Sequence, residues 1–450
     1  MTWLSGCLLF ASLARLSVAA LSGQSIGPTT STASKRAIKV CNIMEHGGVA
    51  SRTADNGPAI AAAWDACRAG GEVYIPAGEY GLATWVVLDK AKHVALNIDG
   101  TIFRAGTANG NMILISDSND VEVYSASGRG AIQGFGYDFH QVGEYGPRIM
   151  RVRHCTNFSV HDFVLVDSPA FHLTVDNSTN GEVFNLVVHG GYKGGLDGID
   201  VWGANIWVHD VEVSNKDECV TVKSPAKNIL VESVHCNWSG GCAIGSLSTG
   251  TSISNVVYRN IYTHHSNQLF MIKSRGGSGS VSSVHLDNFI GHSNAYGFDL
   301  DSDWQRQVVG AGPGVSYSKI SVTNWNGTSR IDQIQRAAIR VLCPAEVPCK
   351  NILIRDVNIR DENGSATTEV CENAFGAGSC LAGRGKHTVT DPKPAAGDAA
   401  AAQPFVVKPM LPNELPAPFD VNQPIPIPAM PATFFPGVPP KSPVLAQRSG

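Results

Sequence analysis

The sequence predicts an all-β fold: a right-handed parallel β-helix (solenoid) with an N-terminal capping helix and a Pro/Ala-rich C-terminal tail. The main observation is a loose repeat, in which an Asn precedes an alternating strand, a polar pair and a second apolar strand. Copies begin at Asn157, Asn205, Asn228, Asn255 and Asn351. The consecutive copies lie roughly 25 residues apart, a period typical of solenoids, and side chains that alternate with a period of two indicate strands. Leucine-rich repeats share the period but need Leu at fixed positions, which these copies lack.

Residues 1–20 are expected to form a signal peptide. An apolar stretch from Cys7 to Ala11 precedes the small residues from Ser17 to Ala20, a pattern that suits signal peptidase. The alternative is an apolar N-terminal tail. No later stretch approaches the ~20 apolar residues of a membrane span, so we expect a secreted, extracellular protein without a membrane partner.

The predicted β-helix domain spans residues 21–384. Asp55 or Asn56 is expected to cap a helix that starts near Pro58 and continues through Ala59 to Ala69, covering the open N-terminal end of the coils. Residues 385–450 are expected to form the tail, because 15 of the chain's 24 prolines lie from Thr388 onward. Proline cannot donate to a sheet, so the coils must have ended there. We expect an extended or disordered tail rather than a second functional domain.

Cysteine and sequon usage fit an oxidising compartment. Without Cys7 ten cysteines remain, and short spacings suggest four bridges, although sequence alone cannot fix the pairing. The suggested pairs are Cys41–Cys67, Cys219–Cys236, Cys343–Cys349 and Cys371–Cys380, which leaves Cys155 and Cys242 as buried thiols. Five Asn-x-Ser/Thr sites are candidate glycosylation sites: Asn157, Asn177, Asn237, Asn326 and Asn363.

The composition points to no nucleic-acid partner, because 34 basic and 38 acidic residues give a net charge of only −4. No CxxC or His pair has the spacing of a structural zinc site, so no metal or cofactor is predicted.

Two acidic clusters lie about one coil apart and carry the functional prediction. Asp197 precedes Asp217 by roughly 20 residues, close to one coil of a solenoid, and Asp200 and Glu218 lie beside them. Carboxylates stacked on neighbouring coils repel one another, so at least one keeps its proton near neutral pH. A protonated carboxyl beside an ionised one is the equipment of a glycoside hydrolase. Each residue alone could instead be an ordinary turn residue.

Downstream side chains are candidates for substrate binding. Lys273 and Arg275 follow one or two coils later, where Lys273 could bind a uronic acid carboxylate or simply face solvent. Trp202, Trp238 and Trp304 are candidate sugar platforms, although tryptophans also fill cores. His292 could relay a proton, but a lone His is more often structural.

Four motifs together resemble glycoside hydrolase family 28, the pectin-degrading β-helix enzymes that include polygalacturonases and rhamnogalacturonases. They are Asp197-Gly198-Ile199-Asp200, Lys216-Asp217-Glu218-Cys219-Val220, Ser239-Gly240-Gly241-Cys242 and Met271-Ile272-Lys273. The chain departs from the polygalacturonase pattern, with Gly240 near the usual His and Met271 in place of the usual Arg. These departures match the fungal rhamnogalacturonan hydrolases of the family, and the likeness extends over nearly the whole chain.

The resemblance implies roles for individual residues. Asp217 matches the general acid, Asp197 and Glu218 match the pair that activates water, and Asp200 would tune them. Lys273 matches a lysine that binds a substrate carboxylate, and Trp304 aligns loosely with a substrate-binding Tyr. The family inverts anomeric configuration, which implies about 6.5–9.5 Å between acid and base, although some inverting sites are tighter.

The expected function is therefore endo-acting hydrolysis of galacturonosyl-α-(1→2)-rhamnosyl bonds in rhamnogalacturonan I, by a monomer without a cofactor. Three alternatives remain open. They are a xylogalacturonan or polygalacturonan hydrolase, a β-helix polysaccharide lyase, and a non-catalytic pectin-binding protein.

Overall fold

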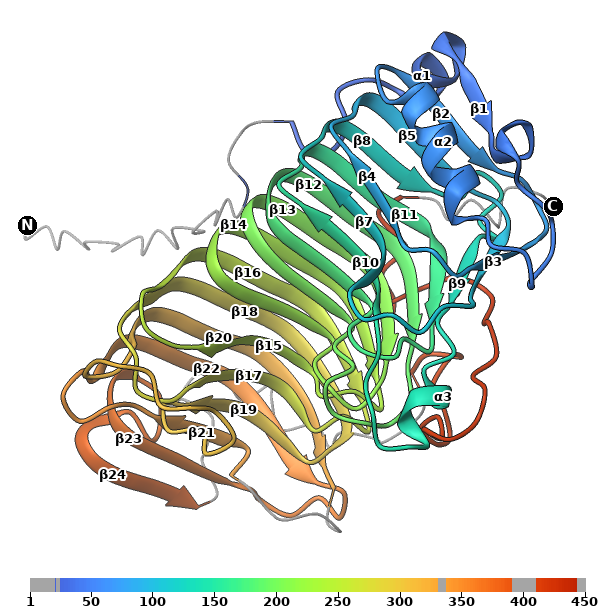
Figure 1. The fold of residues 1–450 in the computed structure, drawn as a ribbon. Coiled ribbons are helices and arrows are strands. Elements are labelled where there is room, and N and C mark those ends of the chain that lie inside the picture. Colours follow the sequence, from blue (N-terminus) through green and yellow to red (C-terminus); the bar gives the residue numbers. More distant parts are fainter. Residues whose placement is uncertain (1–20, 22–24, 331–336, 391–409, 443–450) are drawn as a thin grey trace, which may run out of the picture.

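Parallel strands coil about one axis and form an elongated molecule (Figure 1). The computed structural model describes residue 21 and residues 25–330, 337–390 and 410–442. The predicted signal peptide, residues 1–20, lies outside this part of the chain. No helix within the described ranges is long and apolar enough to cross a membrane.

Three parallel sheets run along the coils, and the early strands each belong to one of them. The first sheet begins with β1 (Val40–Asn42), β2 (Gly71–Ile75), β5 (Lys92–Ile98) and β8 (Asn119–Tyr124). The second begins with β3 (Glu79–Leu82), β6 (Thr101–Arg104) and β9 (Ala131–Gln133). The third begins with β4 (Val86–Asp89), β7 (Asn111–Ser116) and β10 (Arg148–Arg153).

Later strands are longer and bend from one sheet into the next. They are β11 (Thr156–Val166), β12 (Leu173–His189), β13 (Ile199–Ser214), β14 (Val220–Asn237), β16 (Thr251–His264), β18 (Gly279–Asn294), β20 (Ser316–Ser329) and β22 (Cys349–Asp361). The third sheet continues through β15 (Cys242–Leu247), β17 (Gln268–Ser274), β19 (Tyr296–Asp301), β21 (Ile339–Leu342) and β23 (Thr368–Ala377). Antiparallel pairing of β23 with β24 (Ala382–Thr390) ends the coils, so β24 crosses the expected domain boundary at residue 384.

The repeated Asn residues turn the chain at one corner of each coil. Asn157, Asn205, Asn228, Asn255 and Asn351 all have a positive φ, between 55° and 58°. Asn tolerates this left-handed conformation better than other side chains that carry a Cβ. Their amides also stack from coil to coil, since Asn255 Nδ2 donates to Asn228 Oδ1 at 2.7 Å. The Asn repeat is therefore a ladder of corners.

Short helices lie mainly at the N-terminal end of the coils. The helices are α1 (Thr32–Ile38), the 3₁₀ helix η1 (Ile43–His46), α2 (Gly57–Cys67) and α3 (Tyr137–His140). The helix α2 begins one residue before Pro58 and ends two residues before the expected Ala69. The Asp55 side chain accepts from the Gly57 backbone N–H at 3.1 Å, and Cys67 bridges to Cys41, so this helix is anchored to the first strand of the coils.

The described residues contain four disulfides, and they are the four suggested pairs: Cys41–Cys67, Cys219–Cys236, Cys343–Cys349 and Cys371–Cys380. Cys155 and Cys242 are free and buried. The interior of the coils is one continuous apolar core.

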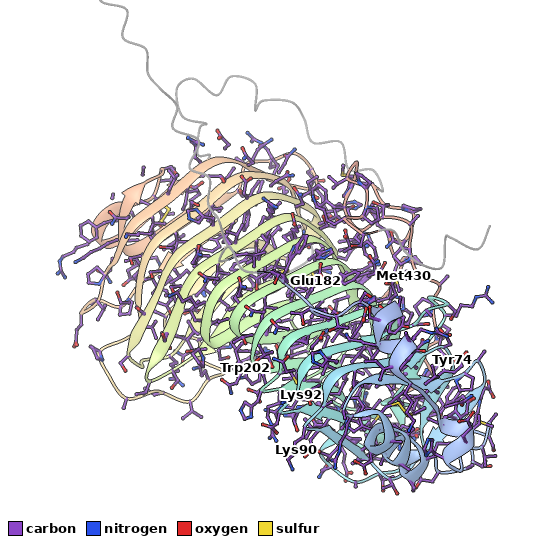
Figure 2. All side chains as sticks on the ribbon, turned by 90° about the horizontal axis from the view of Figure 1, so that it is seen from above. Tyr74, Lys90, Lys92, Glu182, Trp202 and Met430 are labelled. Carbon is purple, nitrogen blue, oxygen red and sulfur yellow. A yellow bond between two sulfur atoms is a disulfide. The ribbon has the colours of Figure 1, made fainter. Side chains whose placement is uncertain are left out.

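Residues 410–442 of the tail lie on the outer face of the coils. Phe419 and Met430, the latter labelled in Figure 2, pack with Ile425 against apolar side chains of β9, β11 and β12. Gln133 donates to the Ile425 carbonyl at 2.9 Å. This part of the tail is therefore extended and packed on the body, with Ile425 and Leu411 buried.

Candidate active site

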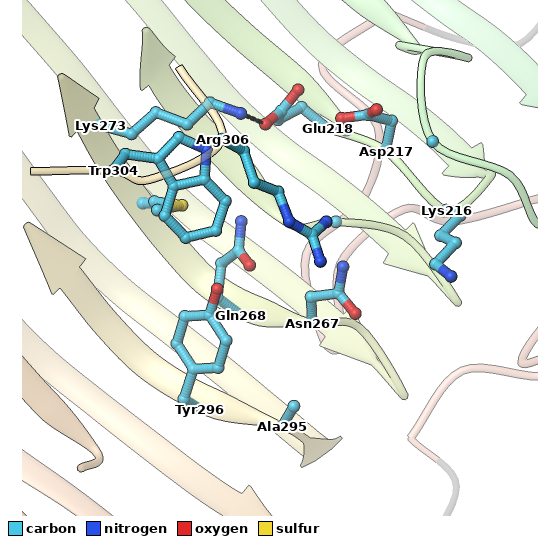
Figure 3. A pocket seen from close by; sticks show the side chains of 13 residues that line it. Lys216, Asp217, Glu218, Asn267, Gln268, Lys273, Ala295, Tyr296, Trp304 and Arg306 are labelled. Atoms are coloured by element: carbon cyan, nitrogen blue, oxygen red, sulfur yellow. Dashed lines mark hydrogen bonds and ion pairs between the residues drawn. The ribbon is translucent and has the colours of Figure 1, made fainter. Parts of the chain in front are cut away.

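A cleft of about 370 Å³ opens beside the third sheet, around the loops that precede its strands (Figure 3). Loops before β13, β14 and β15 contribute Gly194, Lys216, Asp217, Glu218 and Gly240. The strands β17 and β19, with the residues just before and after them, contribute Asn267, Gln268, Met271, Lys273, Ala295, Tyr296, Trp304 and Arg306. Both predicted acidic residues of the second cluster and two predicted binding residues, Lys273 and Trp304, therefore share one cleft.

Close stacking of two coils brings the carboxylates together. The Gly198 backbone N–H donates to the Glu218 carbonyl at 2.9 Å, so the loop that carries Asp197 lies directly against the loop that carries Glu218. A Cβ on Gly198 would lie 2.5 Å from the Cys219 carbonyl oxygen, so this approach needs glycine. One carboxylate oxygen from each of Asp197, Asp217 and Glu218 lies within 4.8 Å of the others. The carboxyls are therefore closer together than the separation of about 6.5–9.5 Å expected between acid and base.

Asp217 keeps its proton to a higher pH than an ordinary aspartate does. Burial raises its pKa to about 7, and the negative charge of Glu218 adds to the effect. Backbone N–H groups of Gly195 and Glu218 hold the two oxygens of Asp217, the second at 2.9 Å. The result is a fixed, largely buried acid that can donate a proton near neutral pH.

Glu218 is held in the opposite protonation state. Burial alone would raise its pKa, but the ammonium group of Lys273 and the hydrogen bond with Asp217 outweigh burial and lower it. Lys273 Nζ forms an ion pair with Glu218 Oε1 (Figure 3). Neighbouring residues 217 and 218 therefore provide a protonated acid and an ionised carboxylate.

Lys223 joins the two acids of the first cluster. Its Nζ lies 3.3 Å from Asp197 Oδ2 and 3.3 Å from Asp200 Oδ1. Burial raises the pKa of both carboxyls, and so do their acidic neighbours, while Lys223 opposes the shift. Lys223 and Lys273 together place two ammonium groups among the carboxyls of Asp197, Asp200, Asp217 and Glu218. The two lysines therefore balance much of the negative charge.

Sequence reasoning missed Lys223, although a signal was present. In β14, Val220 and Val222 belong to the apolar core, so Thr221 and Lys223 point away from it, and Thr221 pairs in register with Asp200. A lysine at an outward position of that strand must lie near the first acidic cluster. Lys216 stands in one of the four motifs but was given no role there. The missed cleft residues Gln268, Tyr296 and Arg306 belong to none of these motifs.

Arg275 acts through a loop rather than in the cleft. Its guanidinium lies 3.2 Å from Asp303 Oδ1 and donates to the Gln307 carbonyl and the Gln305 side chain, both at 3.1 Å. These contacts fix the loop that carries Trp304 and Arg306 over the cleft.

The structure does not bring His292 or Trp238 to the cleft. His292 Nδ1 lies 3.5 Å from Glu414 of the tail, and Trp238 Nε1 donates to the Leu415 carbonyl at 2.7 Å. Both side chains contact the tail, and neither lines the cleft. Trp202 also lies outside the cleft, half-buried on β13.

A glycan on Asn237 is incompatible with this packing. The side chain is fully buried, its Nδ2 donates to the Asn413 carbonyl at 2.9 Å, and its Oδ1 accepts from the Leu415 N–H at 3.2 Å. The candidates Asn177, Asn326 and Asn363 are exposed, and Asn157 is half-buried.

Comparison with known proteins places this architecture among carbohydrate-active enzymes. The family model for glycosyl hydrolases family 28 matches residues 69–380. Rhamnogalacturonase A of Aspergillus aculeatus is 51% identical over 430 residues, which cover 94% of this chain and 96% of that protein. Rhamnogalacturonase A of Emericella nidulans is 50% identical over 442 residues, covering 98% of this chain and 86% of its own.

A solved structure has the same fold. The endo-xylogalacturonan hydrolase from Aspergillus tubingensis superposes with a TM-score of 0.65 and covers 72% of this chain and 94% of its own. At 21% identity this similarity establishes the parallel β-helix alone.

Proposed function

This chain belongs to glycosyl hydrolases family 28, and on that premise we propose that it cleaves the rhamnogalacturonan I backbone of pectin within the chain. The bond is the galacturonosyl-α-(1→2)-rhamnosyl linkage. Two relatives named rhamnogalacturonase A, each about half identical over nearly the whole length, support this choice of substrate. The observation that carries the chemistry is the buried Asp217 carboxyl, whose pKa is raised to about 7, beside Glu218, whose pKa is lowered by Lys273.

Asp217 is the proposed general acid. A buried carboxyl with a pKa of about 7 carries its proton at the mildly acidic to neutral pH where it must protonate a leaving glycosidic oxygen. The N–H groups of Gly195 and Glu218 hold it in place, so its direction does not depend on the substrate.

Asp197 and Glu218 are the proposed pair that activates water. Their nearest oxygens lie within 4.8 Å of one another, so one water could contact both, with the resulting proton shared between them. Lys223 lies between Asp197 and Asp200 and opposes the rise that burial causes in the pKa of Asp197. Neither Asp200 nor Lys223 needs to contact the sugar. We propose inversion of configuration, as the family resemblance implies.

Cations of the cleft suit a uronic acid in the substrate. Lys273, Lys216 and Arg306 all line it, and Trp304 offers an aromatic face for a pyranose ring. Gly240 and Met271, which replace the His and Arg of polygalacturonases, also line it. A Cβ on Gly240 would lie 2.7 Å from the Asp217 backbone carbon, so no side chain fits there without a shift of the acid's own loop.

We also propose that the enzyme acts outside the cell as a monomer. Four disulfides among the described residues suit an oxidising compartment, as does the predicted signal peptide at residues 1–20. Asn177, Asn326 and Asn363 remain the proposed glycosylation sites, with Asn157 as a less accessible fourth.

Product analysis tests the substrate. The purified enzyme is incubated with deacetylated rhamnogalacturonan I and, separately, with polygalacturonate, and oligomers are identified by mass and by their two new ends. Saturated oligomers with a non-reducing rhamnose, from the first polymer alone, are expected. Cleavage of polygalacturonate alone contradicts the substrate, and unsaturated uronide ends contradict hydrolysis.

Proton NMR of the first products tests the stereochemistry. Inversion gives a β-configured reducing-end galacturonate before mutarotation. An initial α product would mean retention, to which carboxyls about 5 Å apart are also suited.

A further inference from the structure

Three side chains with free electron pairs converge under the tail, away from the cleft. His264 ends β16, His292 lies near the end of β18, and Glu414 belongs to the tail. His264 Nε2 lies 3.4 Å from Glu414 Oε2, and His292 Nδ1 lies 3.5 Å from the same oxygen. All three side chains are buried or nearly so, with 7–9% of each exposed. Such a convergence needs a positive species at its centre.

The hydrogen bonds around His264 fix which nitrogen faces Glu414. Asn237 Nδ2 donates to the Asn413 carbonyl and its Oδ1 accepts from the Leu415 N–H, so the orientation of this amide is determined. His264 Nδ1 lies 3.0 Å from that Oδ1 and must therefore be the protonated nitrogen. In the neutral ring, Nε2 then carries a lone pair directed toward Glu414. Metal-ligating histidines have this arrangement, with the second ring nitrogen donating to an oxygen.

Glu414 is oriented in the same way. Its Oε1 accepts from the Tyr262 hydroxyl and from the Met410 N–H, the latter at 3.0 Å. Both bonds hold one oxygen of the carboxylate and leave Oε2 facing the two imidazoles. An outer shell of this kind fixes ligands around a metal ion.

The His292 side chain is buried, and within the described part of the chain its Nδ1 makes only the long contact with Glu414. Only 9% of its side chain is exposed, and its Nδ1 has no hydrogen-bond partner among the described residues. A buried polar atom without a partner costs about 1–3 kcal/mol, so such atoms are rare unless a water or an ion completes them. The neighbouring His265 is not among the converging ligand atoms, and its ring stacks on Trp238 at 4.5 Å.

The distances match a tetrahedral site. Two ligands bound at about 2.0–2.1 Å with a tetrahedral angle lie about 3.3–3.4 Å apart. The two pairs that share Glu414 Oε2 are 3.4 and 3.5 Å apart, and all three ligand atoms lie within 4.8 Å of one another. Two imidazoles and one carboxylate suit zinc, or another borderline divalent cation, rather than calcium or magnesium.

We propose that His264, His292 and Glu414 form a zinc site that fastens the tail to the coils, with water as the fourth ligand. Two ligands come from neighbouring coils and the third from the tail, far along the chain. The ion therefore closes a long loop and holds Glu414 where Tyr262 and Asn237 meet the tail. It takes no part in hydrolysis, because its ligands lie outside the cleft.

Zinc titration of the whole enzyme tests the site. Chelator-treated protein is titrated calorimetrically with ZnCl₂, and with CoCl₂ while absorbance is recorded. One Zn²⁺ per chain is expected, together with the intense visible bands of tetrahedral Co²⁺. The variants Glu414→Gln, which keeps the shape of the ligand, and His292→Phe, which fills its volume, should each bind at least ~10-fold more weakly.

His265→Phe is the matched control, because it changes an adjacent ring that is not a ligand. It should bind zinc as the parent does, and circular dichroism should show all three variants folded. Limited proteolysis gives a second readout: cleavage within 410–442 should slow when zinc is added to the parent and the control, but not in the two ligand variants.

Three results would overturn the proposal. They are absence of stoichiometric zinc binding, binding that Glu414→Gln and His292→Phe leave unchanged, and tail protection that follows pH alone. The last would mean that a protonated histidine holds Glu414. Each result is independent of activity on pectin, so failure of the zinc site and failure of the proposed substrate are distinguishable.

Discussion

Two regions of the same coils use stacked carboxylates in opposite ways. Asp217 and Glu218 line the cleft, a carboxylate oxygen of Asp197 lies within 4.8 Å of theirs, and the pKa of the Asp217 carboxyl rises to about 7. On other faces an acid stacks on an imidazole instead: Glu122 lies 3.1 Å from His161, and Glu212 lies 3.0 Å from His189.

Burial alone would raise the pKa of Glu122 and Glu212 too, but their histidine partners outweigh it and lower the pKa of both. Both regions stack acids against residues of neighbouring coils, although the acids of the cleft lie in loops and Glu122 and Glu212 lie on strands. What differs is the residue one coil away, and that choice separates a reactive group from a structural one.

We expect the largest effect from a substitution that removes the acid, Asp217. Asp217→Asn keeps the size and one of the two hydrogen-bond acceptors but cannot act as an acid, so turnover should fall by about 10²–10⁴-fold while substrate binding persists. Initial rates on rhamnogalacturonan I and calorimetric binding to an oligomer check both parts. Asp420→Asn, an exposed change in the tail, is the control and should leave both unchanged. Retained turnover in Asp217→Asn would refute the acid assignment.

Neutralising Glu212, an acid that contacts a histidine, should instead lower the stability of the fold. Glu212→Gln removes the buried negative charge of a side chain whose Oε1 lies 3.0 Å from His189 Nε2, and it should lower the free energy of unfolding by roughly 1.5–3 kcal/mol at pH 7. The folded-state pKa of Glu212 is depressed, so its stabilisation is present above the unfolded pKa and is lost as pH falls through the folded one. The deficit should therefore shrink below about pH 4. Urea unfolding at both pH values measures it, with the exposed Glu346→Gln as control.

The same kind of neutralisation in the cleft should stabilise. The folded-state pKa of Asp217 is raised to about 7, so ionisation destabilises the fold as pH rises from the unfolded pKa of about 3.9 toward 7. Asp217→Asn removes that cost, so unfolding should need roughly 1–4 kcal/mol more at pH 8 and no more at pH 4. If Asp217→Asn and Glu212→Gln change stability in the same direction at pH 8, the comparison of the two regions fails.

We expect the smallest effect from a substitution of Lys223, which positions and charges Asp197 without lining the cleft. Lys223→Met removes the cation between Asp197 and Asp200, so the pKa of Asp197 should rise further and the ionised base should form only at higher pH. The acidic limb of kcat should move up in pH, with kcat about 10-fold lower at pH 5 and KM little changed. Lys227→Met, an exposed change on the same strand, should move neither limb.

Much of this molecule could be predicted from local pattern, because each coil repeats a local rule. An Asn at the start of each repeat predicts a corner, since Asn tolerates positive φ, and Asn205 and Asn228 turn there. The spacing of Asp197 and Asp217 placed the acids on neighbouring coils. The actual offset is one residue longer, because Ile199 pairs with Val220, and Asp197 therefore lies beside Glu218.

What could not be predicted depends on the tail. The sequon at Asn237 predicts an exposed side chain, but contacts with Asn413 and Leu415 of the tail bury it. His292 looks like a relay for the acids until Glu414 places it elsewhere. No periodicity connects residues 410–442 to the coils, so sequence spacing carried no information about these contacts. The cleft side chains Tyr296 and Arg306 were missed for a similar reason, because loops bring them there.

The tail also contacts residues that are synthesised long before it. Asn413 contacts His235, Gln133 binds Ile425, and Asp210 binds Lys441, across sequence separations of 178, 292 and 231 residues. A ribosome finishes these segments only after every coil beneath them exists. A chain cut short before residue 410 would expose apolar side chains of β9, β11 and β12 to water. Exposed apolar surface of this kind promotes aggregation and is bound by chaperones. Residues 410–442 therefore cover a face of the coils that a shortened chain would leave exposed to water.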